Sequence, residues 1–342
     1  MSPSPKIVWA NYLRAAATIG VIFIHSSSYL TGSFGQISQS YWVISIVINT
    51  LVRWAVPVFV MLTGSFVLAN YNNQPRPFFI KAFKKIIIPF LIWSIVYLLY
   101  YNWETLLGNS ITNSQKWALI LNKLVTGTAV HLWYIYMIAG MYLLIPIIAN
   151  WTKEASEKQL RIFILFWFIL LIAYPWIDQY KNDFELGFFT GYVGYLIAGY
   201  YFFKFVNIPK WILWLSLIFI CILISLATCY LGFQKNVDKE MFLAPLTPSI
   251  FIMSASVYLL FKQSTVSLNS WLAQVVNWIC DYSYGIYLIH LLVLSLIDDK
   301  IMSIDGIHPL LSIPIVSVLC LLFSFSIIYL LRRIPIIGKW VG

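Results

Sequence analysis

The residues best suited to chemistry lie on one segment near the N-terminus. Arg14 and His25 interrupt an apolar run over residues 7–30 and stand 11 positions apart. An α-helix turns about 100° per residue, so this spacing puts both side chains on one face, about 16 Å apart along the axis. Asn11 and Thr18 lie near the same face and complete a polar stripe. Histidine accepts a proton near neutral pH, and arginine stabilises developing negative charge.

The chain that carries this stripe has the composition of a membrane protein. Of its 342 residues, 61% are hydrophobic and 10% are charged, whereas a soluble domain carries about 25% charged residues. A mean hydropathy of +0.83 agrees. An ionisable side chain within a span costs roughly 2.5–3.5 kcal/mol on insertion scales, and it marks a functional site by default. The structural alternative is a polar network that only holds helices together.

Segments long enough to cross a bilayer core of about 30 Å, which needs roughly 20 residues, define the predicted fold. They cover residues 7–30, 42–69, 83–101, 131–149, 160–177, 187–204, 210–231, 243–261, 276–297 and 311–331. We therefore expect an all-α, polytopic integral membrane bundle of about ten transmembrane helices. It forms a single domain over residues 1–342, with no soluble domain.

Loop charges predict the orientation of this bundle. With the N-terminus inside, Arg14 and Arg53 fall within spans, six lysines fall outside, and the other 14 of the 22 basic residues fall on the cytoplasmic side. The outer lysines are Lys116, Lys123, Lys181, Lys235, Lys239 and Lys300. The excess follows the positive-inside rule and predicts cytoplasmic N- and C-termini. Because topology accounts for the net charge of +10, no nucleic-acid partner is expected.

Other cations lie within or beside the second and third spans. Arg53 lies in the middle of the second span, and Pro57 one turn later frees a backbone carbonyl that offers the arginine a purely structural partner. Lys81, Lys84 and Lys85 precede the third span. They are either topology signals or a docking surface for a polyanion.

Three histidines share one predicted membrane depth. His290 lies on one helix face with Ser283 and Tyr287, and His131 begins the fourth span. The topology puts both rings in the outer half of the bundle, as it does His25. Three histidines at one depth suggest a reaction zone, although the sequence does not fix that they converge. The four cysteines have no metal-ligand spacing, so no metal is expected.

These landmarks together resemble a known family. The segment NYLRAAATIGVIFIH, residues 11–25, resembles the R-x10-H signature of membrane acyltransferase family 3. Four segments follow in the family's order: VRWAVPVFVMLTGSF (52–66), HLWYIYMIAGMYLLIPII (131–148), FTGYVGYLIAGYYF (189–202) and YSYGIYLIH (282–290). The resemblance spans nearly the whole chain. It is strongest to the branch that O-acetylates surface polysaccharides such as enterobacterial common antigen.

The resemblance implies an activity and its partners. An acetyl group would move from cytosolic acetyl-CoA, as a substrate, to a hydroxyl of a cell-surface polysaccharide or lipid-linked glycan across a bacterial cytoplasmic (inner) membrane. His25 would act as a base or carry the acetyl group transiently, and Arg14 would orient the donor and stabilise negative charge. Relatives often carry arginines where this chain has lysines at 81–85, and lysine offers a point charge in place of a bidentate fork.

The remaining candidates divide between the two substrates. Donor binding or charge stabilisation falls to Arg53, Lys81, Lys84 and Lys85. The acceptor falls to His131, Trp133, Ser283, Tyr287 and His290, with His131 and Trp133 as a platform for a sugar ring. Two other classes stay open: a transporter or flippase that uses the buried charges as a path, and a non-catalytic partner in glycan assembly. The acyl chain, the acceptor glycan and a homo-oligomeric state are left open too.

Overall fold

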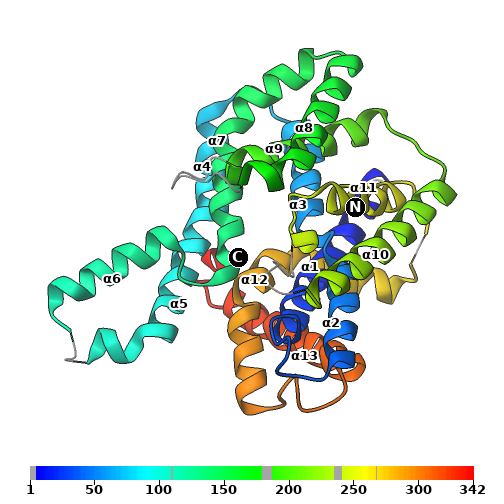
Figure 1. Ribbon diagram of the computed structural model, residues 1–342. Coiled ribbons are helices and arrows are strands. Elements are labelled where there is room, and N and C mark those ends of the chain that lie inside the picture. The colour runs from blue at the N-terminus through cyan, green and yellow to red at the C-terminus, as the bar shows by residue number, and fades with distance from the viewer. Residues whose placement is uncertain (1–4, 109–110, 179–186, 235–240, 267) are drawn as a thin grey trace.

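The computed structural model describes residues 5–108, 111–178, 187–234, 241–266 and 268–342 (Figure 1). Every regular element in these ranges is a helix. The N-terminal half contains α1 (Pro5–Thr31), α2 (Gln39–Val52), α3 (Ala55–Thr63), η1 (Gly64–Leu68), α4 (Pro75–Ala82), η2 (Phe83–Ile87), α5 (Ile88–Leu107), α6 (Asn113–Thr126), η3 (Val130–Leu132) and α7 (Trp133–Glu154). The C-terminal half contains α8 (Glu157–Asp178), α9 (Gly187–Phe205), α10 (Lys210–Gly232), η4 (Met241–Leu243), α11 (Pro248–Lys262), α12 (Ser270–Lys300), α13 (Pro309–Arg332) and η5 (Gly338–Trp340).

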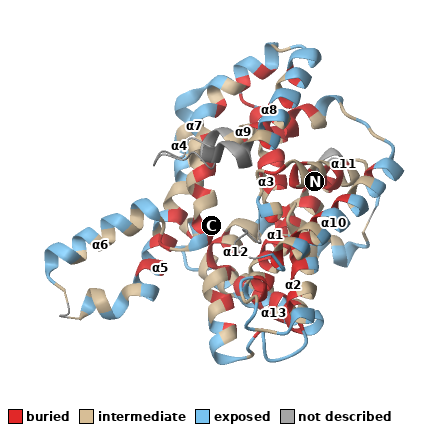
Figure 2. Cartoon of the chain, in the orientation of Figure 1, coloured by how far each residue is buried: buried red, intermediate tan, exposed pale blue. Residues whose placement is uncertain are grey.

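Within the described residues, seven helical segments are long and apolar enough to cross a membrane. They are Gln39–Leu68, Pro75–Leu107, Val130–Glu154, Lys210–Gly232, Met241–Lys262, Ser270–Lys300 and Pro309–Arg332. The chain is thus an all-helical, multi-pass membrane protein. Exposed residues lie along helices such as α6 and α10 (Figure 2), and many large apolar side chains are among the exposed residues. Each of the ten predicted segments contains a helix, but α1, α8 and α9 are not among the seven. The count of ten and the terminal orientation stay predictions.

Two features bear on the absence of α1, α8 and α9 from the seven segments. Helix α1 carries the polar stripe of Asn11, Arg14, Thr18 and His25, which lowers its hydropathy. Helices α8 and α9 flank residues 179–186, which lie outside the described residues together with the predicted outer lysine Lys181. The predicted outer lysines Lys235 and Lys239 also lie outside the described residues.

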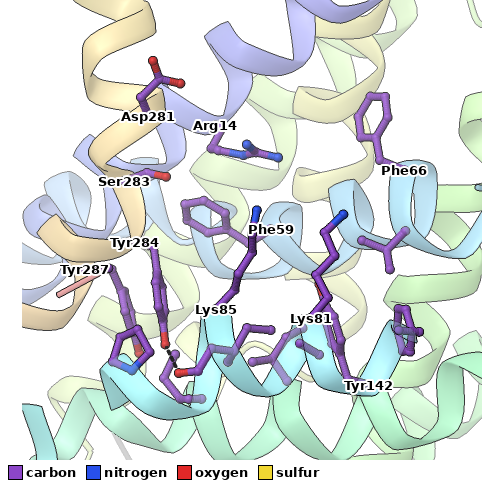
Figure 3. Close-up of a pocket in the computed structure, with 18 of the residues that line it drawn as sticks. Arg14, Phe59, Phe66, Lys81, Lys85, Tyr142, Asp281, Ser283, Tyr284 and Tyr287 are labelled. Atoms are coloured by element: carbon purple, nitrogen blue, oxygen red, sulfur yellow. Dashed lines mark hydrogen bonds between the residues drawn. The ribbon is translucent and has the colours of Figure 1, made fainter. Parts of the chain in front are cut away.

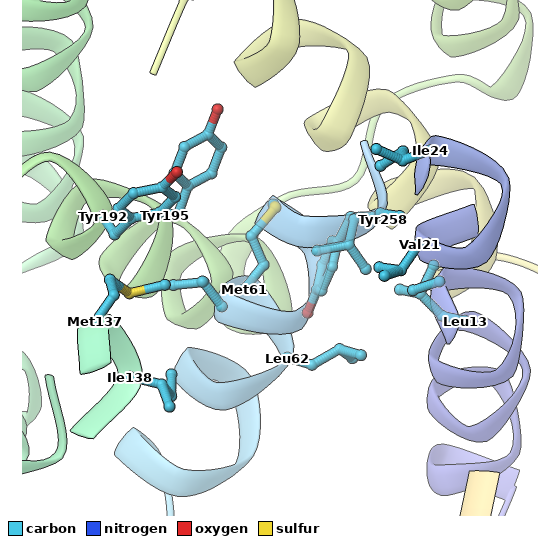
Figure 4. Packing of buried hydrophobic residues seen from close by; sticks show 14 of the residues in the cluster. Leu13, Val21, Ile24, Met61, Leu62, Met137, Ile138, Tyr192, Tyr195 and Tyr258 are labelled. Atoms are coloured by element: carbon cyan, nitrogen blue, oxygen red, sulfur yellow. The ribbon is translucent and has the colours of Figure 1, made fainter. Parts of the chain in front are cut away.

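Helix α1 occupies the interior of the bundle and packs against α2, α3, α11, α12 and α13. Its apolar face is fully buried at Leu13 and Ala17 and nearly so at Val21. This face packs toward Met61 of α3 and Tyr258 of α11 (Figure 4). The bundle therefore presents the apolar side of α1 to one set of neighbours and its polar stripe to another.

The second predicted span, 42–69, is not one continuous helix. It breaks at Arg53 and Trp54 into α2 and α3. Pro57 explains the break, because a proline has no backbone N–H and its ring clashes with the carbonyl four residues earlier, at Arg53. The break puts Arg53 at the C-terminal end of α2, where it caps that helix, rather than in the middle of a helix.

Close packing between α3–η1 and α9 depends on two glycines. A Cβ atom at Gly199 would lie 2.0 Å from the backbone oxygen of Met61. A Cβ atom at Gly64 would lie 1.9 Å from that of Leu196. Both distances are impossible contacts with backbone, so only glycine permits this helix approach. The glycine-rich segment of residues 189–202 therefore has a packing role.

Helices α1 and α12 run parallel, as the ten-span prediction requires of its first and ninth spans. Asn11 Nδ2 donates to Asn277 Oδ1 over 3.1 Å, near the start of both helices. The rings of His25 and His290 lie 5.0 Å apart, further along both. The polar stripe of α1 thus faces α12.

Helix α6 and the end of α5, beyond a kink at Asn102, project from the bundle (Figure 1).

Candidate active site

Three histidines from distant parts of the chain converge beside α1. The ring centres of His25 and His290 lie 5.0 Å apart, and those of His131 and His290 lie 4.9 Å apart. The third pair, His25 and His131, is separated by 6.4 Å. The rings come from α1, η3 and α12, so the structure brings together residues that the sequence only placed at one depth. Among the described residues, no group of His, Cys, Asp or Glu has a metal-binding arrangement.

The backbone of α12 fixes the proton positions on two of these rings. His290 Nδ1 lies 2.6 Å from the carbonyl oxygen of Tyr287, and His131 Nε2 lies 3.3 Å from that of Leu288. A carbonyl only accepts, so each of these nitrogens carries the hydrogen when the ring is neutral. The other nitrogens, His290 Nε2 and His131 Nδ1, are therefore acceptors. Both are buried, and neither has a hydrogen-bond partner within the described structure.

A tyrosine that sequence reasoning did not select supports this arrangement. The hydroxyl of Tyr97 in α5 donates to the carbonyl oxygen of Leu288 over 3.0 Å and accepts from the amide of Leu292 over 3.2 Å. These two groups are four residues apart, the spacing of a helical hydrogen bond. The Tyr97 ring also lies 5.2 Å from that of His131. The sequence holds no signal for this role, because Tyr97 is one of 22 tyrosines.

Arg53 is tied to α1 near His25 through one side chain. Its Nε donates to Asn49 Oδ1. Asn49 Nδ2 in turn donates to the carbonyl oxygen of Ile24 over 3.1 Å and to Ser27 Oγ over 2.8 Å. The arginine therefore brings a positive charge to the edge of the histidine cluster.

A cavity of about 1040 Å³ lies at the Arg14 end of α1. Five cationic side chains line it: Arg14, Lys81, Lys85, Arg332 and Lys339. Arg14 points into the cavity from α1, while Lys81 and Lys85 extend toward the same space from α4 and η2 (Figure 3). Its walls also carry the apolar and aromatic side chains Phe59, Phe66, Tyr134, Tyr142, Tyr284 and Tyr287.

The inner wall of the cavity adjoins the histidine cluster. Tyr287 lines the cavity, and its ring lies 5.4 Å from that of His131 and 5.6 Å from that of His290. The Tyr287 hydroxyl donates to the carbonyl oxygen of His131. Tyr134, also on the wall, lies 5.6 Å from Tyr287 between ring centres. Tyr287 therefore lies between the cavity and the rings of His131 and His290.

Helix α12 also holds Arg14 at the cavity wall. Arg14 Nη1 lies 3.8 Å from Cys280 Sγ, and that thiol lies 3.6 Å from Asn11 Oδ1. Thr18 Oγ1 donates to the carbonyl oxygen of Arg14 over 2.9 Å and so satisfies its hydroxyl within α1. Of the four stripe residues, Asn11, Arg14 and His25 contact α12, and Thr18 does not show such a bond.

The other predicted site residues fall in different places. Ser283 lines the cavity together with Lys81 and Lys85. Lys84 is not on the cavity wall; it lines a surface depression with Arg76, which Lys81 and Lys85 also border. Trp133 packs against Tyr192 of α9 at 5.7 Å and against Tyr134 at 6.1 Å between ring centres.

Two of the five cavity cations, Arg332 and Lys339, were not predicted to be site residues. In the sequence they contributed only to the excess of positive charge on the cytoplasmic side. The C-terminal segment folds back onto the bundle, where Trp93 Nε1 donates to the carbonyl oxygen of Val341 over 3.2 Å. Arg332 Nε donates to that of Gly342 over 2.7 Å. Only this fold-back puts the two cations opposite Lys81 and Lys85, which lie about 250 positions earlier in the sequence.

The fold and the site define a polytopic membrane protein with a cation-lined cavity beside a histidine cluster. Residues 7–329 match the family described as Acyltransferase domain, and the chain belongs to this family, membrane acyltransferase family 3. It is therefore a membrane acyltransferase, and the transporter alternative is not favoured. No curated protein matches the chain, and no solved structure does.

Proposed function

We propose that this protein is an O-acetyltransferase. It moves an acetyl group from cytosolic acetyl-CoA to a hydroxyl of a cell-surface polysaccharide or lipid-linked glycan on the outer side of a bacterial cytoplasmic membrane. The observation that carries this proposal is the cavity lined by five cations, whose Tyr287 wall packs directly against the histidine cluster. Coenzyme A is a polyanion with a reactive group at its far end, and it fits a site with charge at the mouth and a base at the end.

The donor binds by charge and by stacking. Lys81, Lys85, Arg332 and Lys339 attract the phosphates, since charge-assisted hydrogen bonds are about twice as strong as neutral ones. The aromatic wall offers faces for the adenine ring, with Tyr142 and Phe78 already stacked at 5.5 Å. Arg14 lines the same cavity from α1 and orients the thioester end of the donor.

His25 acts as the base in the transfer. It removes the proton from the acceptor hydroxyl while the oxygen forms a bond to the acetyl carbon. The carbon–sulfur bond then breaks, and the CoA sulfur leaves with the proton that His25 took up. The products are the acetyl ester and CoA. Arg53, tied through Asn49 to α1 beside His25, stabilises the negative charge that the acetyl oxygen develops. Arg14, about 16 Å from His25 along α1, acts on the donor in the cavity.

The acceptor is bound on the far side of the cluster. His131 Nδ1 is a buried acceptor in need of a donor, and a sugar hydroxyl is such a donor. Tyr287 and Ser283 on α12 line the donor cavity and position the donor's reacting end. Trp133 packs with Tyr134 and Tyr192, so of the predicted sugar platform only His131 belongs to the acceptor side. This arrangement uses ten spans with both termini in the cytoplasm, and the parallel run of α1 and α12 supports that topology.

The decisive experiment is His25→Ala in inverted membrane vesicles supplied with acetyl-CoA labelled in its acetyl group. We expect alkali-labile label in the vesicle glycan to fall about 10²-fold or more, because a general base contributes 10²–10⁴-fold. The control is His308→Asn, since His308 lies in an exposed loop and caps α13 through its ring, a bond that asparagine can keep. Wild-type labelling by His25→Ala at normal expression would refute the proposal.

A further inference from the structure

The histidine nearest to the proposed base presents an unpaired acceptor. His290 is fully buried, and its Nδ1–H is held by the Tyr287 carbonyl 2.6 Å away. This leaves Nε2 with a lone pair, and within the described structure that atom has no hydrogen-bond partner. A buried acceptor without a donor costs about 1–3 kcal/mol, so its position calls for a donor in the working enzyme.

Two rings lie close enough to donate to this atom. A hydrogen bond of about 2.9 Å between two imidazole nitrogens sets the ring centres roughly 5 Å apart, and the centres of His131 and His25 lie 4.9 and 5.0 Å from that of His290. The Nε2–H of His131 is held by the Leu288 carbonyl and its Nδ1 is an acceptor, so His131 has no hydrogen left to donate. Within the cluster this leaves the partly exposed His25 ring as the donor. Catalytic hydrogen bonds often tighten only when substrate binds.

We propose that His290 is the positioning partner of His25: it accepts the N–H of the His25 ring on Nε2 and so aims the other His25 nitrogen at the acceptor hydroxyl. The proposal rests on the proposed function and adds a role that the sequence did not indicate. It makes a pair of histidines in which the Tyr287 carbonyl sets the tautomer of His290 and His290 sets the tautomer of His25. This series of hydrogen bonds, from the Tyr287 carbonyl through His290 to His25, contains no carboxylate.

The surroundings of His25 make the pair testable through pH. The titratable and charged groups around the cluster are Arg53 from α2, Tyr97 from α5, His131 from η3, Tyr287 and His290 from α12, and Cys320 from α13. None of these six is a carboxylate. A carboxylate at position 290 would therefore add a negative charge where the wild-type cluster has none, and it would favour the protonated form of His25.

The test compares His290→Leu, His290→Gln and His290→Glu in vesicles with labelled acetyl-CoA. His290→Leu removes the acceptor, and kcat should fall about 10²-fold while the KM for acetyl-CoA stays within twofold. His290→Gln and His290→Glu carry an acceptor oxygen near the position of Nε2 and should recover part of this loss. With His290→Glu alone, the acidic limb of the pH–rate profile should move up by about one pH unit or more.

Two outcomes would overturn the pair. One is wild-type kcat in His290→Leu, and the other is identical pH–rate profiles in His290→Gln and His290→Glu. The second comparison stands even if His290→Leu fails to accumulate in membranes. The double variant His25→Ala, His290→Leu should be no less active than His25→Ala alone, because residues that act as a unit lose their effects non-additively. Losses that multiply would also overturn the pair.

The pair and the proposed function fail in different ways. Activity that survives His25→Ala refutes the proposed function whatever position 290 does. Activity that is lost in His25→Ala and kept in His290→Leu refutes the pair alone and leaves His25 as the base.

Discussion

At the scale of single residues, the cavity distinguishes neighbouring lysines by their position on its wall. Lys81, Lys84 and Lys85 are neighbours in sequence, and nothing in their types distinguishes them. The turn of the backbone through α4 and η2 puts Lys81 and Lys85 on the cavity wall and leaves Lys84 off it. Proximity in sequence is therefore a poor guide to which of the three contacts the donor.

The first prediction concerns this lysine triplet. The double variant Lys81→Gln, Lys85→Gln should raise the KM for acetyl-CoA about tenfold, because each lost charge weakens phosphate binding by up to about 1 kcal/mol at an exposed position. The matched variant Lys84→Gln should change KM less than twofold. Initial rates at varied acetyl-CoA measure both. An equal rise in KM for the two variants would mean that the cavity wall does not define the donor site.

How much of the site the sequence predicts differs from residue to residue. The polar face of α1 follows from helical spacing, and Asn11, Arg14 and His25 do contact α12 as one stripe. The convergence of His131 with the other two rings depends on how η3 meets α12. Such contacts join residues more than 150 positions apart and have no periodic signal in the sequence.

At the scale of elements, α12 organises the site. Its backbone carbonyls at Tyr287 and Leu288 hold His290 and His131, and Tyr97 from α5 bonds to the same turn. A membrane interior offers no water to backbone groups, so a side chain that bonds to a helix carbonyl there is strongly retained. The turn around Leu288 therefore determines the orientation of two of the three rings.

The second prediction tests this turn. Tyr97→Phe removes the hydroxyl between Leu288 and Leu292, and we expect kcat to fall about tenfold, since one buried hydrogen bond contributes 0.5–1.5 kcal/mol and its loss also frees the His131 ring. The KM for acetyl-CoA should not change, because Tyr97 does not line the cavity.

Tyr100→Phe is the control for that variant. Tyr100 lies in the same helix and its hydroxyl lies 3.1 Å from Ser295 Oγ of α12, at an exposed position. It should keep wild-type kcat. Equal activity in Tyr97→Phe and wild type would show that the Leu288 turn holds its shape without the tyrosine.

The elements also show where sequence patterns fail. Hydropathy located a helix in every predicted span, because apolar length is a strong signal. It did not locate the break between α2 and α3, although Pro57 was the visible cause. It also gave no hint that the segment after α13 returns to the bundle, since a short fold-back is held by individual bonds such as Arg332 to Gly342.

At the scale of the whole molecule, charge is distributed so that one end of the bundle attracts anions. The five cavity cations come from α1, α4, η2, the end of α13 and η5, so segments from both ends of the chain make one positive field. A field built from several charges raises the local concentration of an anionic ligand and weakens with salt.

The third prediction follows from this field. Raising NaCl from 20 to 300 mM should increase the KM for acetyl-CoA several-fold, because the screening length falls below about 10 Å near 0.1 M salt. The kcat should stay within twofold, since His131 and His290 are buried and His25 is only partly exposed. The Lys81→Gln, Lys85→Gln variant should show a smaller salt effect than wild type. A KM that does not respond to salt would contradict electrostatic capture of the donor.

The pairing of α1 with α12 has a consequence for the order in which the helices are synthesised and inserted into the membrane. His25 and His290 are separated by 265 positions, so a ribosome must deliver most of the chain before the two rings can meet. Helix α1 therefore enters the bilayer early with its polar face unmatched. Asn49, only 24 positions after His25, bonds to the backbone of Ile24 and to Ser27 and gives that face a first partner. Helix α2 can therefore satisfy part of the polar face of α1 before α12 is synthesised.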